Sequence, residues 1–227
     1  MNLLAKYFPN AVTMKSDFVQ ATGETLYMTA ITAIVAGIIG MAIGIGLIVT
    51  QPGGILENRV IYNILDKIVN LCRSIPFVIL LAVIAPLTRI IVGTAIGTTA
   101  AIVPLVIGSA PFYARQIQNA LAEVDRGVIE AAESVGSGPI AIIFRVYLKE
   151  GLADIIRSSV LTLISLIDLT AMAGAIGGGG LGNLAINVGY SRFETDVTVM
   201  AMLIILVIVF AIQLIGDLLA RHVDHTA

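Results

Sequence analysis

A polar segment in the middle of an otherwise apolar chain holds the side chains best placed to recognise another molecule. It reads EAAESVG from Glu130 to Gly136 and lies within residues 115–157, which hold five of the thirteen Lys and Arg. The carboxylate of Glu130 stands beside Ala131 and Ala132, whose small side chains let another protein surface approach the backbone closely. The pattern therefore fits either contact with a partner or an ordinary amphipathic connector at the membrane surface, and the residue types alone do not choose between them.

Two charged residues inside apolar runs are candidates for a role within the membrane. Arg73 and Asp168 each cost on the order of 3 kcal/mol to insert, so such a charge usually faces a cavity or a partner. Each lies about 20 Å along a helix that leaves the same side of the membrane, and we hypothesise that they pair near a path across it. The alternative is that Arg73 reaches the interface or backbone carbonyls while Asp168 meets water separately. The other candidates for lining this path are Ser74, Pro76, Thr170 and Met172.

A glycine-rich stretch has the GxGxxG spacing of dinucleotide-binding sites, at Gly177, Gly179 and Gly182. A true site of this kind follows a strand and opens a helix in a βαβ unit, whereas this stretch follows a predicted membrane span. It therefore favours a flexible turn that permits helix motion, or a close approach of backbone between two subunits, because glycine tolerates positive φ and lacks a side chain. The sequence contains no P-loop ending in Gly-Lys-Ser or Gly-Lys-Thr, so we expect no cofactor in this chain.

Other constellations of catalytic or coupling residues are not found in the sequence. The two histidines, His222 and His225, lie in the C-terminal tail, whereas an intramembrane hydrolase needs a Ser-His, paired-Asp or metal arrangement. An ion-coupled secondary transporter uses intramembrane carboxylates and internal inverted repeats, but this chain has one such acid, Asp168, and no evident repeat. The single Cys72 permits no internal disulfide. We therefore expect a chain that is not an enzyme and holds no metal.

Composition places these residues in a membrane protein. Hydrophobic residues make up 58% of the 227 residues and charged residues 12%, which leaves too little polar surface to cover a soluble globule. Continuous apolar runs exclude the alternating strands of a β-barrel. We predict an all-α, polytopic membrane protein with five transmembrane helices, each of roughly 20 residues or more, in a single domain over residues 1–227. The spans are expected near residues 22–49, 58–86, 92–118, 152–176 and 196–220, with a polar loop at 120–150.

The distribution of basic residues predicts the orientation of the spans. Five spans put the termini on opposite sides, and cytoplasmic loops carry an excess of Lys and Arg. With the N-terminus outside, eight basic residues face the cytoplasm and four face outward. We therefore expect an outer N-terminus, a cytoplasmic C-terminus and a cytoplasmic polar loop. The cytoplasmic set is Arg59, Lys67, Arg115, Arg126, Arg145, Lys149, Arg157 and Arg221, and the outer set is Lys6, Lys15, Arg89 and Arg192.

The polar loop at 120–150 is expected to form a short helix, a break and a second helix. Asp125 can cap the first helix with its side-chain oxygen. The sequence GSGP at 136–139 stops that helix and starts the next. The apolar stripe of the first helix is expected at Val128, Ile129 and Ala132.

The same segment resembles the EAA signature of the membrane subunits of ATP-binding-cassette importers. The matching residues are Glu130, Ala131, Ala132, Gly136, Val146 and Leu148. In that family the segment is a coupling helix that docks into a cleft on the cytoplasmic ATPase subunit, and the resemblance implies this role for the first four of them. The family pattern usually closes with Leu-Pro, whereas Lys149 follows Leu148 here, which leaves the bend after the second helix open.

A wider resemblance connects the chain with the permeases of methionine importers. The matching stretches are RSIPFVILL at 73–81, IVGTAIGTTAAI at 91–102, PFYA at 111–114, AMAGAIGGGGLG at 171–182 and GD at 216–217. The resemblance implies a homodimeric permease with two cytoplasmic ATPase subunits and a lipid-anchored substrate-binding protein outside. It would import D- or L-methionine across the cytoplasmic membrane by alternating access, while the partner chain hydrolyses ATP. The alternatives are an importer permease for another amino acid or small substrate, or an ion-coupled secondary transporter.

Overall fold

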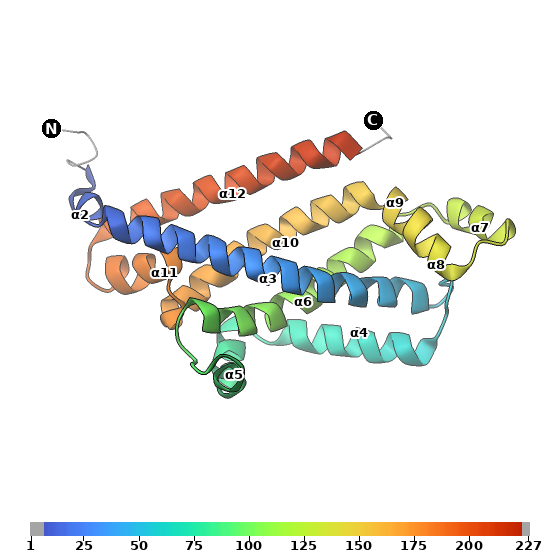
Figure 1. Cartoon of the computed structure of the whole chain (residues 1–227), viewed down its shortest axis with the longest axis horizontal. Coiled ribbons are helices and arrows are strands. Elements are labelled where there is room, and N and C mark those ends of the chain that lie inside the picture. Colours follow the sequence, from blue (N-terminus) through green and yellow to red (C-terminus); the bar gives the residue numbers. More distant parts are fainter. Residues whose placement is uncertain (1–6, 224–227) are drawn as a thin grey trace. The chain divides into compact units, whose positions relative to one another are not determined.

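Helices form the elements of the computed structural model, which describes residues 7–223 (Figure 1). Lys6 and His225 lie outside that range. No strand occurs between residues 7 and 223, in agreement with the predicted all-α class. The elements, with η marking π-helices, are α2 (Pro9–Thr13), α3 (Lys15–Thr50), α4 (Arg59–Ser74), α5 (Phe77–Val92), α6 (Thr98–Ala122), α7 (Arg126–Ser134), α8 (Pro139–Ile142), η1 (Ile143–Tyr147), α9 (Leu148–Glu150), α10 (Leu152–Ala173), η2 (Gly174–Gly178), α11 (Gly180–Asn183), η3 (Leu184–Tyr190) and α12 (Thr195–Val223).

Four of the described helices are long and apolar enough to cross a membrane. They are α3, α6, α10 with its continuation through η2, and α12. The pair α4 and α5 counts as a fifth candidate if the two are taken as one broken span. The described range therefore contains four to five spans, in line with the five predicted.

The predicted span at 58–86 is divided between α4 and α5. Ile75, with φ −83° and ψ 122°, and Pro76, with φ −58° and ψ 131°, are both extended. Proline disfavours helical geometry in the residue before it and has no N–H to continue the helix. The helix α5 extends beyond residue 86, where the predicted span ended. Pro86 lies inside α5, and the helix ends at Val92, before Gly93, whose φ is 86°.

The described residues form two compact units, each built from three stretches of chain. Unit 1 contains residues 7–34, 76–107 and 163–212, and unit 2 contains residues 35–75, 108–162 and 213–223. The helices α3, α6, α10 and α12 each continue from one unit into the other. Since four helices run through both units, the division does not separate two independent domains along the sequence. A single permease domain over residues 1–227 stays a prediction.

Within unit 2, small residues bring α3 and α6 into close contact. A Cβ added at Gly40 would lie 2.8 Å from the carbonyl oxygen of Ala110, and one at Gly44 would lie 2.7 Å from that of Ala114. The two glycines have the GxxxG spacing that lets helix backbones approach each other in membranes. Neither position has room for a larger side chain, so this contact fixes α6 beside α3 and positions the polar segment that follows α6.

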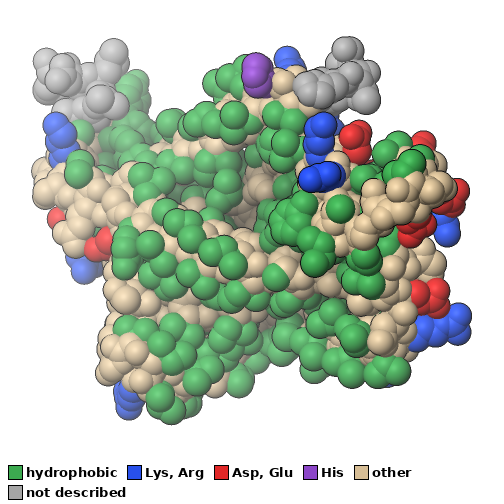
Figure 2. Space-filling model, turned by 45° about the vertical axis from the view of Figure 1, so that its right-hand side comes forward, with side chains coloured by type: hydrophobic (Ala, Val, Ile, Leu, Met, Phe, Trp, Pro, Cys, Tyr) green, Lys and Arg blue, Asp and Glu red, His purple; other side chains and the backbone are tan. Residues whose placement is uncertain are grey.

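Figure 2 shows hydrophobic side chains over much of this face of the molecule, with the Lys, Arg, Asp and Glu side chains mainly toward its edges. Along α12, Val207, Phe210, Leu214 and Leu218 are all exposed. Apolar surface of this extent is unfavourable in water, whereas lipid or a neighbouring helix covers it in a bilayer. The surface therefore supports the membrane class derived from composition.

Candidate functional site

The helix α7 forms because its first backbone groups find a cap. The side chain of Asp125 accepts a hydrogen bond of 2.6 Å from the N–H of Gly127, as predicted for the residue before the helix. The helix ends at Ser134, and the exposed Gly136 adopts a φ of 78°, which other residues rarely do. A new helix, α8, begins at Pro139. The helix, break and second helix expected between 120 and 150 are all present.

One face of α7 is buried and the other is open. Ile129 is buried and Ala132 is half-buried, whereas Val128, the third member of the predicted apolar stripe, is exposed. Glu130 and Ala131 are also exposed. The residues of the EAA signature therefore present a carboxylate and a small side chain to the surroundings, which leaves this face available to a partner.

Beneath α7, side chains from six helices of unit 2 pack into what we call the anchor cluster. Its buried members are Ile48, Val49, Tyr113, Ile117, Ala120, Leu121, Ile129, Ile142, Val146, Tyr147 and Ile155. These residues belong to α3, α6, α7, α8, η1 and α10. Because packed protein interiors are dense and transmit strain, a displacement of α7 would be carried to the ends of α3, α6 and α10.

The second half of the segment, from α8 through η1 and α9, is nearly continuous and ends at Gly151. Glu150 is the last helical residue, and Gly151 has φ −79° and ψ 4° before α10 begins. A Cβ added at Gly151 would lie 2.8 Å from the carbonyl oxygen of Tyr147 and 3.0 Å from Leu121. The helical run that contains Lys149 therefore ends two residues later, at this tightly packed glycine.

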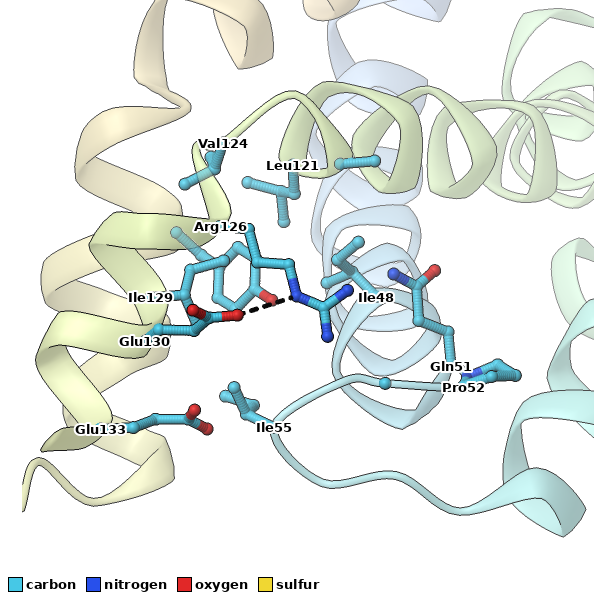
Figure 3. Close-up of a pocket in the computed structure, with 13 residues that line it drawn as sticks. Ile48, Gln51, Pro52, Ile55, Leu121, Val124, Arg126, Ile129, Glu130 and Glu133 are labelled. Carbon is cyan, nitrogen blue, oxygen red and sulfur yellow. Dashed lines mark ion pairs between the residues drawn. The ribbon is translucent and has the colours of Figure 1, made fainter.

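A cavity of about 210 Å³ separates α7 from the loop that follows α3. The loop contributes Gln51, Pro52, Gly53 and Ile55, and α7 contributes Arg126, Ile129, Glu130 and Glu133 (Figure 3). The guanidinium of Arg126 pairs with Glu130 at 3.3 Å, and a Cβ added at Gly53 would lie 3.4 Å from it. Both members of the pair are largely exposed, so it contributes about 0.5 kcal/mol or less. The Glu130 carboxylate can therefore exchange this contact for one with a partner at little cost.

Two titratable groups near α7 are perturbed by their surroundings. The N–H of Gly53 donates to Glu57 at 3.0 Å and Arg59 lies 3.3 Å away, and both contacts lower the pKa of the Glu57 carboxyl. Burial raises the pKa of the Tyr147 hydroxyl, and the carboxylate of Glu133 raises it further. Glu57 is therefore ionised and Tyr147 neutral at pH 7, so neither group changes charge within the physiological range.

A polar network in unit 2 connects α4, α6 and the loop that follows α3, and the sequence alone did not predict it. Arg115 forms an ion pair with Asp66 and donates to Asn70 at 3.1 Å. It also donates to Gln118, whose amide reaches Gln51 at 3.4 Å. The paired side chains are only 17% and 27% exposed, so removing either would leave a poorly solvated charge. One signal in the sequence could have indicated this ion pair: Asp66 and Arg115 are an acid and a base in apolar runs expected near the same side of the membrane.

The six residues expected to line a path across the membrane fall in both units. Arg73, Ser74, Pro76, Asp168 and Met172 are exposed, and Thr170 is buried. Thr170 donates to the carbonyl of Ile167 at 2.7 Å, and Ser74 likewise bonds a carbonyl one turn earlier at 2.8 Å. Their hydroxyls are therefore satisfied within their own helices. Arg73 belongs to unit 2 and Asp168 to unit 1, and their pairing stays a prediction.

The glycine-rich stretch packs directly on α3 within unit 1. The N–H of Gly180 donates to the carboxylate of Glu24 at 2.7 Å, and the N–H of Leu181 donates to the hydroxyl of Thr25 at 2.9 Å. A Cβ added at Gly179 would lie 2.7 Å from a carboxylate oxygen of Glu24. The structure shows these glycines in a close approach to α3 of the same chain. The two roles expected for them, a flexible turn or a close approach between two subunits, stay predictions.

The described residues offer no evident site for a metal or a dinucleotide. Between residues 7 and 223, no three His, Cys, Asp or Glu side chains come together in a way that could hold a metal ion. His222 lies in the last turn of α12. The GxGxxG glycines follow α10, a helix, rather than a strand, so they lack the βαβ setting in which this pattern binds pyrophosphate.

Comparisons with known proteins agree on one class. The family described as binding-protein-dependent transport system inner membrane component matches residues 42–226. The chain is 47% identical to the probable D-methionine transport system permease protein MetI of Vibrio cholerae, over 99% of this chain and 98% of that protein. It is also 47% identical to the methionine import system permease protein MetP of Bacillus subtilis, over 98% and 99%. A solved structure, described as inward facing conformations of the MetNI methionine ABC transporter, matches with a TM-score of 0.92 and 41% identity, over 94% of this chain and 99% of that one.

Proposed function

The chain belongs to the family of binding-protein-dependent transport system inner membrane components, and from this premise we propose that it forms the translocation pathway of an ATP-driven importer for methionine, in its D or L form. The names of two relatives, each 47% identical over almost the full length, support the substrate. The observation that carries the mechanism is the open Glu130 face of α7 above the buried anchor cluster. The anchor cluster connects this exposed face of α7 with the ends of α3, α6 and α10.

The chain is a multi-pass transport subunit of the membrane and not an enzyme. Its sequence contains no P-loop, so the nucleotide is bound and hydrolysed by a separate ATPase chain. When ATP closes two such ATPase subunits, a docked α7 moves with them, and the anchor cluster carries the motion to α3, α6 and α10. The permease then supplies an element with two states, and the nucleotide supplies the bias between them.

The proposed assembly contains two copies of this chain, two cytoplasmic ATPase subunits and an extracytoplasmic substrate-binding protein. No cofactor is assigned to this chain. The N-terminus would lie outside and the C-terminus in the cytoplasm, because eight basic residues then face the cytoplasm against four outside. This orientation places α7 on the side where the ATPase is found.

Coupling to the ATPase is assigned to Glu130, Ala131, Ala132 and Gly136, and the path is assigned to Arg73, Ser74, Pro76, Asp168, Thr170 and Met172. The pair within the path is tested by exchanging its charges. Arg73→Asp and Asp168→Arg should each reduce methionine uptake at least tenfold, because each leaves a like-charged or unpaired group within the membrane. Uptake by the double exchange should recover, and its failure to recover in a normally assembled transporter would sink direct pairing.

The substrate is tested by uptake in cells that carry the complete transporter. Labelled L-methionine should enter in an ATP-dependent manner, and unlabelled D-methionine should compete with it. A transporter that moves another amino acid and ignores both forms of methionine would overturn the substrate while leaving the architecture intact. Uptake driven by an ion gradient without ATP would instead indicate a secondary transporter.

A further inference from the structure

Three large apolar side chains are exposed in the segment that contains α7, although that segment lies between two spans. Val135 is 82% exposed, Ile140 is 73% exposed and Phe144 is 66% exposed. They occupy the end of α7, the start of α8 and the start of η1. We call these three side chains the outer apolar patch. Exposed apolar side chains within ten residues of one another, in a segment that is not one of the candidate spans, favour a contact site.

The patch is a separate surface from the one that anchors this segment. Ile142, Val146 and Tyr147, which alternate with the patch along the chain, are buried in the anchor cluster. Within and beside the π-helical turn η1, Ile142 and Val146 are buried whereas Ile140 and Phe144 are exposed, so the two pairs lie on different faces. π-helical turns are rare and are frequently found at functional sites. The apolar character of Ile140 and Phe144 is thus not needed for folding of the segment itself.

The patch continues the surface of α7. It begins at Val135, directly after the helix, and α7 packs against both α8 and η1 (Figure 1). The elements that carry the patch are therefore direct neighbours of α7, and a partner docked on α7 lies close to them.

The charges around the patch favour a protein over the membrane surface as its occupant. Exposed acids, Glu130, Glu133 and Glu150, stand in the same segment as exposed bases, Arg145 and Lys149. An anionic membrane surface attracts basic segments and repels carboxylates. An apolar centre with a rim of mixed charge is instead the usual composition of a protein interface.

We propose that Val135, Ile140 and Phe144 form a second contact for the cytoplasmic ATPase subunit, which binds them through an apolar surface beside the site that receives α7. This inference rests on the proposed function, because it assumes that α7 docks on the ATPase. In addition to α7, the neighbouring elements α8 and η1 would then also contact the ATPase. Loss of the patch would weaken ATPase binding while the EAA residues remain intact.

Photo-crosslinking in the complete transporter tests the contact directly. p-Benzoylphenylalanine in place of Phe144 should crosslink to the ATPase subunit in native membranes, and the same group in place of Glu133 on α7 serves as the reference. Crosslinks from Glu133 but only lipid adducts, or none, from Phe144 would overturn this inference and leave the proposed function standing. Absence of ATPase crosslinks from both positions would overturn the proposed function as well.

A matched pair of substitutions supplies a second readout. Ile140→Ser should weaken retention of the ATPase by the purified permease about fivefold to tenfold, as expected for an apolar interface residue. Ile96→Ser is the control, because Ile96 is 71% exposed in the turn between α5 and α6 and should leave retention unchanged. Equal retention by both variants would contradict the proposal.

Discussion

The polar segment at α7 and the glycine-rich stretch at η2 and α11 both interrupt the spans, but they are held in opposite ways. α7 makes its own cap and is fixed by burial of apolar side chains such as Ile129. The glycine-rich stretch is fixed by side chains of α3 that accept hydrogen bonds from its backbone, and by the absence of Cβ atoms where the chains touch. A helix that is fixed by burying one face can accept substitutions on its exposed face. A segment that is fixed by close backbone contact cannot accept larger side chains.

The largest effect is expected where the glycine-rich stretch admits no side chain. A Cβ at Gly182 would overlap the backbone of Ala171, so Gly182→Val should cost more than the about 1 to 3 kcal/mol of ordinary overpacking. We expect little folded transporter, measured as the monodisperse fraction after extraction. Gly23→Ala is the control, because nothing lies within 4 Å of its added Cβ and alanine favours a helix interior. Normal yield of the Gly182 variant would show that this approach is not tight.

A smaller effect is expected from weakening the anchor of α7. Ile129→Ala should lower stability by about 2 to 4 kcal/mol, because it removes buried methyl groups and leaves a cavity. Val128→Ala, at the exposed neighbour, should change stability by about 0.5 kcal/mol or less. Thermal unfolding of the purified permease compares the two. Equal losses would mean that burial of Ile129 does not hold the helix.

The smallest effect is expected at the hydrogen bond that links α3 to the glycine-rich stretch. Glu24→Ala leaves the N–H of the buried Gly180 without its acceptor, at a cost of about 1 to 2 kcal/mol. Glu24→Gln keeps a side-chain oxygen that can accept the bond and should retain most of the stability. Thermal unfolding again provides the comparison, and identical behaviour of the two variants would assign the loss to something other than this bond.

Local signals in the sequence predicted the helix boundaries of the polar segment, although Val128, expected in its apolar stripe, is exposed. The Asp125 cap, the break at Gly136 and the restart at Pro139 all act within a few residues, and each is present in the structure. The helical class and the four to five spans follow from continuous apolar runs in the same way. Features that depend on neighbours along the chain could therefore be predicted.

Contacts between distant residues could not be predicted in this way. Arg115 and Asp66 are 49 residues apart, and Glu24 and Gly180 are 156 residues apart. A single sequence marks each of these as a charge or a glycine in an apolar run but does not state which partner it meets. The contact of the glycine-rich stretch with α3 is likewise absent from any local pattern in the sequence.

The central claim, that α7 couples a partner ATPase to transport, is tested by one measurement on Ala131→Arg. Ala131 is exposed and does not belong to the anchor cluster, so a bulky charge there should block docking without unfolding the helix. The ratio of methionine imported to ATP hydrolysed, measured in proteoliposomes with the complete transporter, should fall at least tenfold relative to Ala131→Ser. A ratio equal to that of the serine variant, in a fully assembled transporter, would contradict the account.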